Sequence, residues 1–290
     1  STSAGTCLIA ATIAANGGYA SATSTPATFT FNKASSSITA TGTTSYTYSG
    51  SPQGPSTSSV TGSTGAVTYS YSGTGSTTYG PTPTKPTNVG TYSVTATVAA
   101  DTNYLTATST GLAFTINKAN QASITSVTLS STSKNYPYSQ TVTVSSITGG
   151  SGIGTPSITS VANGTATVCS YTGTTLTAST AGTCILTVTN AGDSNYNAAT
   201  TTTTFTFGKA TQATLSITPG SGTYGTPFRL TTTGGSGTGS VTYSTTSAGC
   251  SITAGTDSLT ATGAVNCTVT ATKAADASYG AITSASVDIS

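Results

Sequence analysis

Cysteine is the most reactive residue type in this sequence, and four of the five cysteines form two closely spaced pairs. Cys169 precedes Cys184, and Cys250 precedes Cys267. A bridge within each pair would close a loop of about 16–18 residues and contribute about 3 kcal/mol. Cys7 stands at the position of Cys184 and Cys267 in its own repeat, so we expect its partner to lie upstream of residue 1. Two matched pairs predict disulfides and an oxidising, extracellular or cell-surface setting.

The sequence has few residues of the types that catalysis or metal binding requires. The sequence has no histidine and no glutamate, so a nucleophile would lack its usual base. Asp101, Asp193 and Asp276 are the same residue in successive repeats, which favours an Asx turn before a tyrosine. The alternative is calcium at each domain junction, but calcium usually takes several carboxylates. We therefore expect a protein that is not an enzyme and has no catalytic residue, metal or cofactor.

Tyrosines repeat at a constant distance from the cysteine position. The cysteine position of the four repeats holds Cys7, Tyr92, Cys184 and Cys267. A tyrosine stands 12 residues after each of them, and these tyrosines are Tyr19, Tyr104, Tyr196 and Tyr279. A constant spacing favours a structural position, such as a plug at the end of each domain, over a ligand-stacking position. Tyr92 replaces the cysteine in a repeat without cysteines, so its ring is expected to fill the space of the bridge.

The segments that carry these positions alternate between apolar and hydroxyl side chains. In 91–98, Tyr92, Val94, Ala96 and Val98 are expected to face inward, with Thr and Ser outward. Ser and Thr account for 119 of 290 residues, whereas charged residues make up only 4%. Thr is β-branched and favours strands, so it can cover the solvated face of a sheet without charge. The pattern predicts an all-β protein built from sandwich domains.

The repeats have a period of about 85–92 residues, and three of them close with a run that ends in Lys-Ala. This period fits one small sandwich domain. We expect an incomplete domain at 1–33, consisting of its last two strands, and three full domains at 34–118, 119–209 and 210–290. Because the junctions are short and poor in glycine, the domains are expected to form a semi-rigid rod.

The combined motifs resemble tandem immunoglobulin-like repeats of large bacterial surface and secreted proteins. The domain at 34–118 resembles the MBG-type repeat, and those at 119–209 and 210–290 resemble its cysteine-bearing relatives. The motifs that carry the MBG-type resemblance are 48–50 (Tyr-Ser-Gly), 86–92 (Pro-Thr-Asn-Val-Gly-Thr-Tyr), 101–104 (Asp-Thr-Asn-Tyr) and 114–119 (Phe-Thr-Ile-Asn-Lys-Ala). The resemblance implies immunoglobulin-like sandwiches in a stalk, spacer or fibre, and no catalytic residues.

The sequence therefore predicts a structural extracellular protein that associates with copies of itself or with neighbouring repeats. Residues 1–33 either end a domain or complete a sheet in a neighbouring subunit by strand addition, which would build a filament. The alternative is an adhesin that binds carbohydrate or protein, with Tyr69, Tyr71 and Tyr79 as candidate contacts. A net charge of +2 argues against nucleic acid, and no apolar run reaches the 18 residues of a membrane span.

Overall fold

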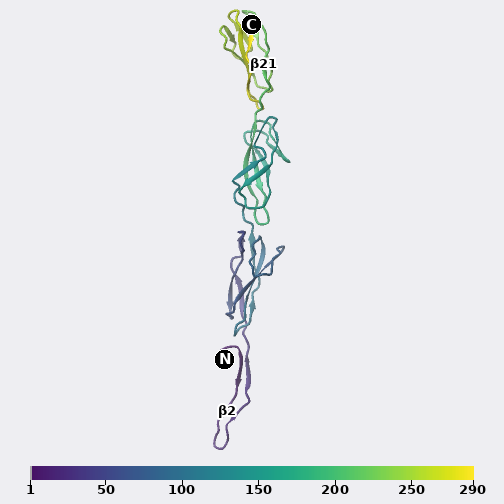
Figure 1. Cartoon of the computed structure of the whole chain (residues 1–290). Coiled ribbons are helices and arrows are strands. Elements are labelled where there is room, and N and C mark those ends of the chain that lie inside the picture. Colours follow the sequence, from purple (N-terminus) through teal and green to yellow (C-terminus); the bar gives the residue numbers. More distant parts are fainter. Residues whose placement is uncertain (1) are drawn as a thin grey trace. The chain divides into compact units, whose positions relative to one another are not determined.

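The computed structural model describes residues 2–290, and every regular element in that range is a β-strand. Figure 1 shows strands in each part of the chain, from the hairpin near the N-terminus to the strands around β21. The predicted all-β class is confirmed. Short strands and frequent turns follow from the composition, because Thr and Val favour strands while glycine permits the sharp reversals between them.

The N-terminal segment is a long hairpin with a two-part ladder. β1 (Gly5–Ile9) pairs antiparallel with β4 (Ala27–Phe31), and β2 (Thr12–Ile13) pairs with β3 (Ala22–Thr23). The register places Cys7 opposite Phe29. None of the three buried clusters in residues 2–290 includes a residue of this hairpin.

The first full repeat is a sandwich of two sheets. β5 and β7 form the smaller sheet, and β9 is the centre of the larger one, where it pairs with β8, β10 and β11. Val94, Ala96 and Val98 of β9 are buried against Ile38 of the other sheet. The strands are β5 (Ser37–Thr41), β6 (Ser45–Thr47), β7 (Thr57–Thr61), β8 (Val67–Gly73), β9 (Gly90–Val98), β10 (Ala107–Thr108) and β11 (Leu112–Asn117).

The second repeat contains a three-stranded sheet, β14-β18-β17, and Cys169 lies directly before its edge strand β17. Its largest sheet has the order β13-β20-β19-β16, with β13 parallel to β20 and the other pairs antiparallel. The strands are β12 (Ser126–Leu129), β13 (Ser133–Asn135), β14 (Ser139–Thr141), β15 (Val144–Thr148), β16 (Pro156–Asn163), β17 (Ser170–Thr172), β18 (Thr175–Thr177), β19 (Gly182–Asn190) and β20 (Ala199–Gly208).

The third repeat follows the same plan with shorter strands. β27 pairs with β24 on one side and with β28 and β29 on the other, and its inward residues Cys267, Val269 and Ala271 are buried. The strands are β21 (Leu215–Ile217), β22 (Phe228–Arg229), β23 (Thr232–Gly234), β24 (Val241–Thr245), β25 (Cys250–Ile252), β26 (Ser258–Ala261), β27 (Cys267–Lys273), β28 (Ile282–Thr283) and β29 (Val287–Ile289).

Spatial contacts divide the chain into two compact units, and the limits of these units differ from the predicted domain boundaries. One unit contains the residues up to Gln121 together with Gly192–Asn197, and the other contains Ala122–Ala191 and Ala198–Ser290. The loop Gly192–Asn197 of the second repeat therefore belongs spatially with the first. The three buried clusters lie within 34–118, 119–209 and 210–290. The domain limits and the semi-rigid rod stay predictions.

Candidate functional site

The structure brings together both predicted cysteine pairs. Cys169 is bonded to Cys184 with 5.9 Å between their Cα atoms, and Cys250 is bonded to Cys267 with 5.8 Å. Both distances lie in the range that disulfides require. In each pair the second cysteine lies on the central strand of the larger sheet and is buried, so each bridge ties that strand to the edge of the smaller sheet.

Two tyrosines occupy the bridge region of the first repeat. Tyr92 is only 2% exposed and stacks on Phe114 with 5.4 Å between ring centroids. Its other contact is the edge of Tyr79 at 5.7 Å, and its hydroxyl donates to the Asn88 carbonyl at 2.7 Å. Burial raises the pKa of Tyr92 above its ordinary value. The sequence indicated the role of Tyr92 but not that of Tyr79, whose position in a loop gave no signal of core packing.

The candidate ligand-binding tyrosines of the first repeat pack against its core. Tyr71 is buried, and its hydroxyl donates to the Pro55 carbonyl at 2.7 Å. Tyr69 and Tyr79 are half-buried and contact the same core. Their rings are therefore not presented together at a loop tip, which an aromatic carbohydrate site would require.

An aspartate organises the same tight loop in each full repeat. One carboxylate oxygen accepts the backbone N–H groups two and three residues further on, at 2.8 Å each; the three aspartates are Asp101, Asp193 and Asp276. The other oxygen of Asp101 accepts the backbone and hydroxyl groups of Thr64, and that of Asp276 does so from Thr238. These hydrogen bonds lower the pKa of Asp101 and of Asp276 to about 2. The bond from the Thr backbone N–H has the largest effect in both cases.

The tyrosine that ends each loop pairs with the alanine that begins the same repeat. A parallel β-bridge forms three times, as Ala34 with Tyr104, Ala119 with Tyr196 and Ala210 with Tyr279. Each alanine N–H donates to the carbonyl just before the tyrosine, at 2.9–3.0 Å. These tyrosines are half-buried. They mark where the chain enters the next repeat.

Tyr19 does not share this environment, so the plug interpretation is wrong for it. It pairs with Asn16 across the hairpin turn and is 85% exposed. The physical reason is that the hairpin has no opposing sheet among residues 2–290, so nothing surrounds its tip.

Side chains reinforce the loops at these junctions. In the first unit, Tyr196 meets Tyr48 edge-on at 5.3 Å, and the Asn195 side chain accepts the Val89 N–H at 3.1 Å. Lys118 donates to the Asp193 carbonyl at 2.6 Å. The second unit has its own aromatic contact of this kind, between Tyr136 and Tyr279 at 5.3 Å.

The N-terminal hairpin carries an apolar face that solvent reaches. Its register places Cys7, Phe29 and Phe31 on one face of the ladder, and the two phenylalanines are 51% and 50% exposed. Cys7 is a free thiol. Both outer edges of the hairpin lack a partner strand among residues 2–290. Unpaired edges of this kind favour strand pairing.

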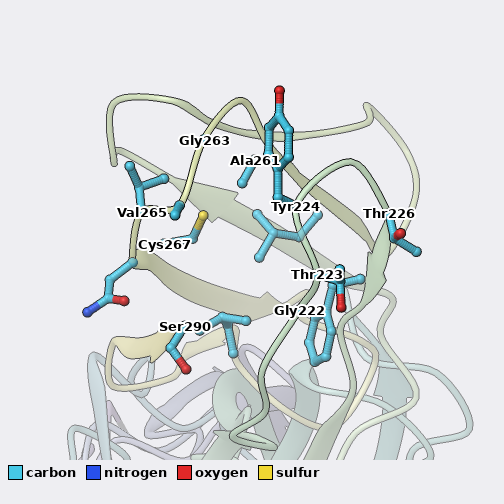
Figure 2. A pocket seen from close by; sticks show the side chains of 14 residues that line it. Gly222, Thr223, Tyr224, Thr226, Ala261, Gly263, Val265, Cys267 and Ser290 are labelled. Atoms are coloured by element: carbon cyan, nitrogen blue, oxygen red, sulfur yellow. The ribbon is translucent and has the colours of Figure 1, made fainter.

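The third repeat has a pocket of about 310 Å³ beside the end of β29, lined by both polar and apolar side chains. Figure 2 shows residues around Tyr224 and Val265 at its mouth, with Cys267 below. Ile289 pairs with Cys267 as Phe205 pairs with Cys184. In the first two repeats the position two residues further along the closing strand is filled by a buried apolar side chain, Ile116 or Phe207.

Side chains of the types that bind metal ions do not gather in the part of the chain that the structure describes. Among residues 2–290, no three His, Cys, Asp or Glu side chains lie together as a metal site would need. The same residues include no helix that is long and apolar enough to span a bilayer.

The comparisons with known proteins identify no family for this chain. No family model matches the sequence, and no curated protein matches it. Among solved structures, the chain is similar to the crystal structure of Drosophila N-cadherin EC1-4, with a TM-score of 0.21 and 7% sequence identity. The match covers 77% of this chain and 66% of that one, slightly less than two thirds of the cadherin chain. The all-β assignment therefore depends on the strands and registers of this chain itself.

Proposed function

We propose that this chain is a structural extracellular protein, a stalk or fibre of tandem immunoglobulin-like sandwiches related to bacterial surface repeats of the MBG type. The observation that carries the proposal is an arrangement repeated three times, in which the alanine that begins a repeat pairs with the tyrosine of that repeat's own aspartate-capped loop. Repetition of one junction is what a spacer requires, because each added repeat extends the chain in the same way.

The two disulfides support the extracellular setting, since such bonds persist where the surroundings are oxidising. The composition supports a structural role that does not depend on ionisable side chains, because charged residues make up only 4% of the sequence. Thr and Ser hydroxyls bond to one another across neighbouring strands instead, as Thr97 does with Thr108 and Thr272 with Thr283.

We further propose that copies associate through the N-terminal hairpin by strand addition. Its two open edges offer unpaired backbone groups, and its phenylalanines offer apolar area to a covering strand. Such association would convert a stalk into a filament.

Electron microscopy and light scattering of the purified chain test the association. Filaments or oligomers are expected at micromolar concentration, and Phe29→Lys with Phe31→Lys should abolish them by charging the apolar face. The matched control is Thr28→Lys with Thr30→Lys, which places the same charges on the other face of β4 and should leave association intact. A chain that stays monomeric refutes self-association. Specific binding on a glycan array would instead favour the adhesin.

A further inference from the structure

Equivalent strands form one edge of the larger sheet in the three sandwiches. β8, β16 and β24 each pair antiparallel with the central strand of their repeat and with no other named strand among residues 2–290. The registers agree, since Tyr71, Val161 and Thr245 each oppose the residue two positions after the cysteine position. An open edge presents backbone groups that can pair with another chain, and proteins usually protect such edges.

The first repeat covers this edge with its own chain. Tyr71 exchanges two backbone hydrogen bonds with Thr82, at 2.8 and 3.0 Å, and the Gly73 N–H donates to the Tyr79 carbonyl at 2.8 Å. The bridge between Tyr71 and Thr82 is antiparallel. The segment 79–82 therefore lies along β8 and occupies the place of a further strand.

The second repeat protects the edge by its sequence and shape. β16 begins with Pro156, which has no N–H to donate, and its register shifts between Ile158 and Ser160. Proline and bulges are common protections of an edge strand, because both interrupt a continuous ladder of hydrogen bonds.

The third repeat has neither kind of protection. β24 contains no proline and pairs with β27 in a continuous register, and the stretch 238–249 contains no charged residue. The strand that follows it, β25, pairs with β26 in the smaller sheet, where the bond from Cys250 to Cys267 also holds it. A groove of about 800 Å³ lies beside β24, lined by 240–243 and 252–257. The edge is therefore accessible to a further strand.

The backbone groups on this edge make β24 its own complement. The Ala274 N–H donates to the Ser240 carbonyl at 2.8 Å, so the alternation of an antiparallel pair turns the backbone groups of Val241, Tyr243 and Thr245 away from β27. Two copies of β24 that run antiparallel about Tyr243 place Val241 opposite Thr245 of the second copy. That register pairs all six outward N–H and C=O groups of each strand.

We propose that β24 is a lateral contact between two copies of this chain, which pair edge to edge about a two-fold axis. A second copy fits because neither strand carries a charge that would repel the other. The register also places Thr242 opposite Ser244 of the second copy, and hydroxyl pairs of this kind already join Ser244 to Thr270 at 2.8 Å. The contact lies outside the N-terminal hairpin and does not depend on it.

The expected dimer is weak and reversible. A ladder of five residues buries less than the roughly 800 Å² per partner of a typical stable complex. A second contact between the same two copies would strengthen it, because the pairing would then be intramolecular. Covalent trapping is therefore the suitable test.

The trap uses two variants of the full chain, Thr242→Cys and Ser244→Cys, each in a Cys7→Ser background. The proposed register brings the Cα atoms of positions 242 and 244 of different copies to about 4.5 Å, whereas two copies of position 242 lie about 8 Å apart. Only the first distance permits a disulfide. With oxidised glutathione as oxidant, the mixture should form about tenfold more covalent dimer than either variant alone, and mass spectrometry should find the bond between positions 242 and 244.

A proline variant separates edge pairing from chance collision of thiols. Val241→Pro copies Pro156, since both positions oppose the residue six places after the cysteine position, and it removes one outward N–H. Added to both trap variants, it should abolish the covalent dimer, whereas Val241→Ala shortens the same side chain, keeps the N–H and should retain the dimer.

A charged pair of variants covers the case in which Val241→Pro does not fold. Thr242→Lys with Ser244→Lys sets like charges against each other across the two-fold axis and should abolish the dimer seen by sedimentation velocity. Thr270→Lys with Thr272→Lys adds the same charge on β27, one strand further in, and should retain it. Equal trapping in single and mixed samples, or no trapping in the mixture, would overturn the inference. Because the bond is located at positions 242 and 244, its presence or absence is independent of association through the hairpin.

Discussion

At the scale of single residues, the aspartate loops make stability depend on pH only near its acid limit. Asp101 and Asp276 accept several backbone N–H groups, which holds their folded-state pKa at about 2 against an ordinary 3.8. Between those values the unfolded chain binds more protons than the folded chain, so stability is present above pH 4 and is lost as the pH falls towards 2. Unfolding followed by circular dichroism from pH 7 to pH 2 checks this.

The double variant Asp101→Asn with Asp276→Asn separates this effect from general acid unfolding. The amide keeps one carbonyl oxygen as acceptor but cannot accept the Thr64 or Thr238 groups through its nitrogen. The variant should melt lower than the parent at pH 7, with the difference shrinking as the pH falls from 4 to 2. A difference that is constant over this range would contradict the assignment.

The backbone conformation of Val168 also predicts a measurable effect on stability. It has φ of 53°, a left-handed conformation that β-branched residues rarely adopt, immediately before Cys169. Asn tolerates that conformation, so Val168→Asn should raise the stability of the second repeat by about 1 kcal/mol. Val265→Asn, at a partly exposed site without positive φ, is the matched control and should change little. Thermal unfolding measures both, and a destabilised Val168→Asn would refute the prediction.

At the scale of elements, the three sandwiches use different means to hold the central strand. Reduction of the disulfides should cost the second and third repeats about 3 kcal/mol each, because their bridges join cysteines that are 15 and 17 positions apart in the sequence. The first repeat has no cysteine and should be unaffected. Hydrogen exchange with and without reductant, resolved by repeat, measures this. Equal losses in all three repeats would show that the bridges act on the whole chain.

The ring pair of the first repeat is expected to take the place of the missing bridge. Tyr92→Ala removes a buried ring that contacts Phe114 and Tyr79, so it should cost the first repeat about 3–5 kcal/mol. Tyr92→Phe keeps the ring and loses only the hydrogen bond to the Asn88 carbonyl, for about 1 kcal/mol. Denaturant unfolding of the two variants provides the comparison, and equal losses would contradict a packing role.

At the scale of the whole molecule, the scarcity of charge predicts a protein that ionic strength scarcely affects. The net charge is +2, and the Arg229–Asp257 ion pair lies on the surface. Salt screens surface charges, and here there are few to screen. The melting temperature at pH 7 should therefore stay nearly constant between about 0.05 and 0.5 M sodium chloride. A shift of many degrees would mean that charges stabilise the fold after all.

The sequence by itself determined the features that depend on local pattern. Alternation along 91–98 gave the inward face of β9, because successive strand residues point to opposite sides. The repeated spacing gave the aspartate turns and paired Cys169 with Cys184, since equivalent positions in equivalent repeats meet equivalent neighbours.

Only the tertiary structure decided features that depend on residues distant in sequence. It placed Tyr79 against Tyr92, paired Ala119 with Tyr196, and left Tyr19 exposed because no second sheet faces its hairpin within residues 2–290. Period-two alternation tells which side of a strand is apolar but not which strand covers it. That choice is made when separate segments compete to bury the same face, and this competition does not appear in any local stretch of sequence.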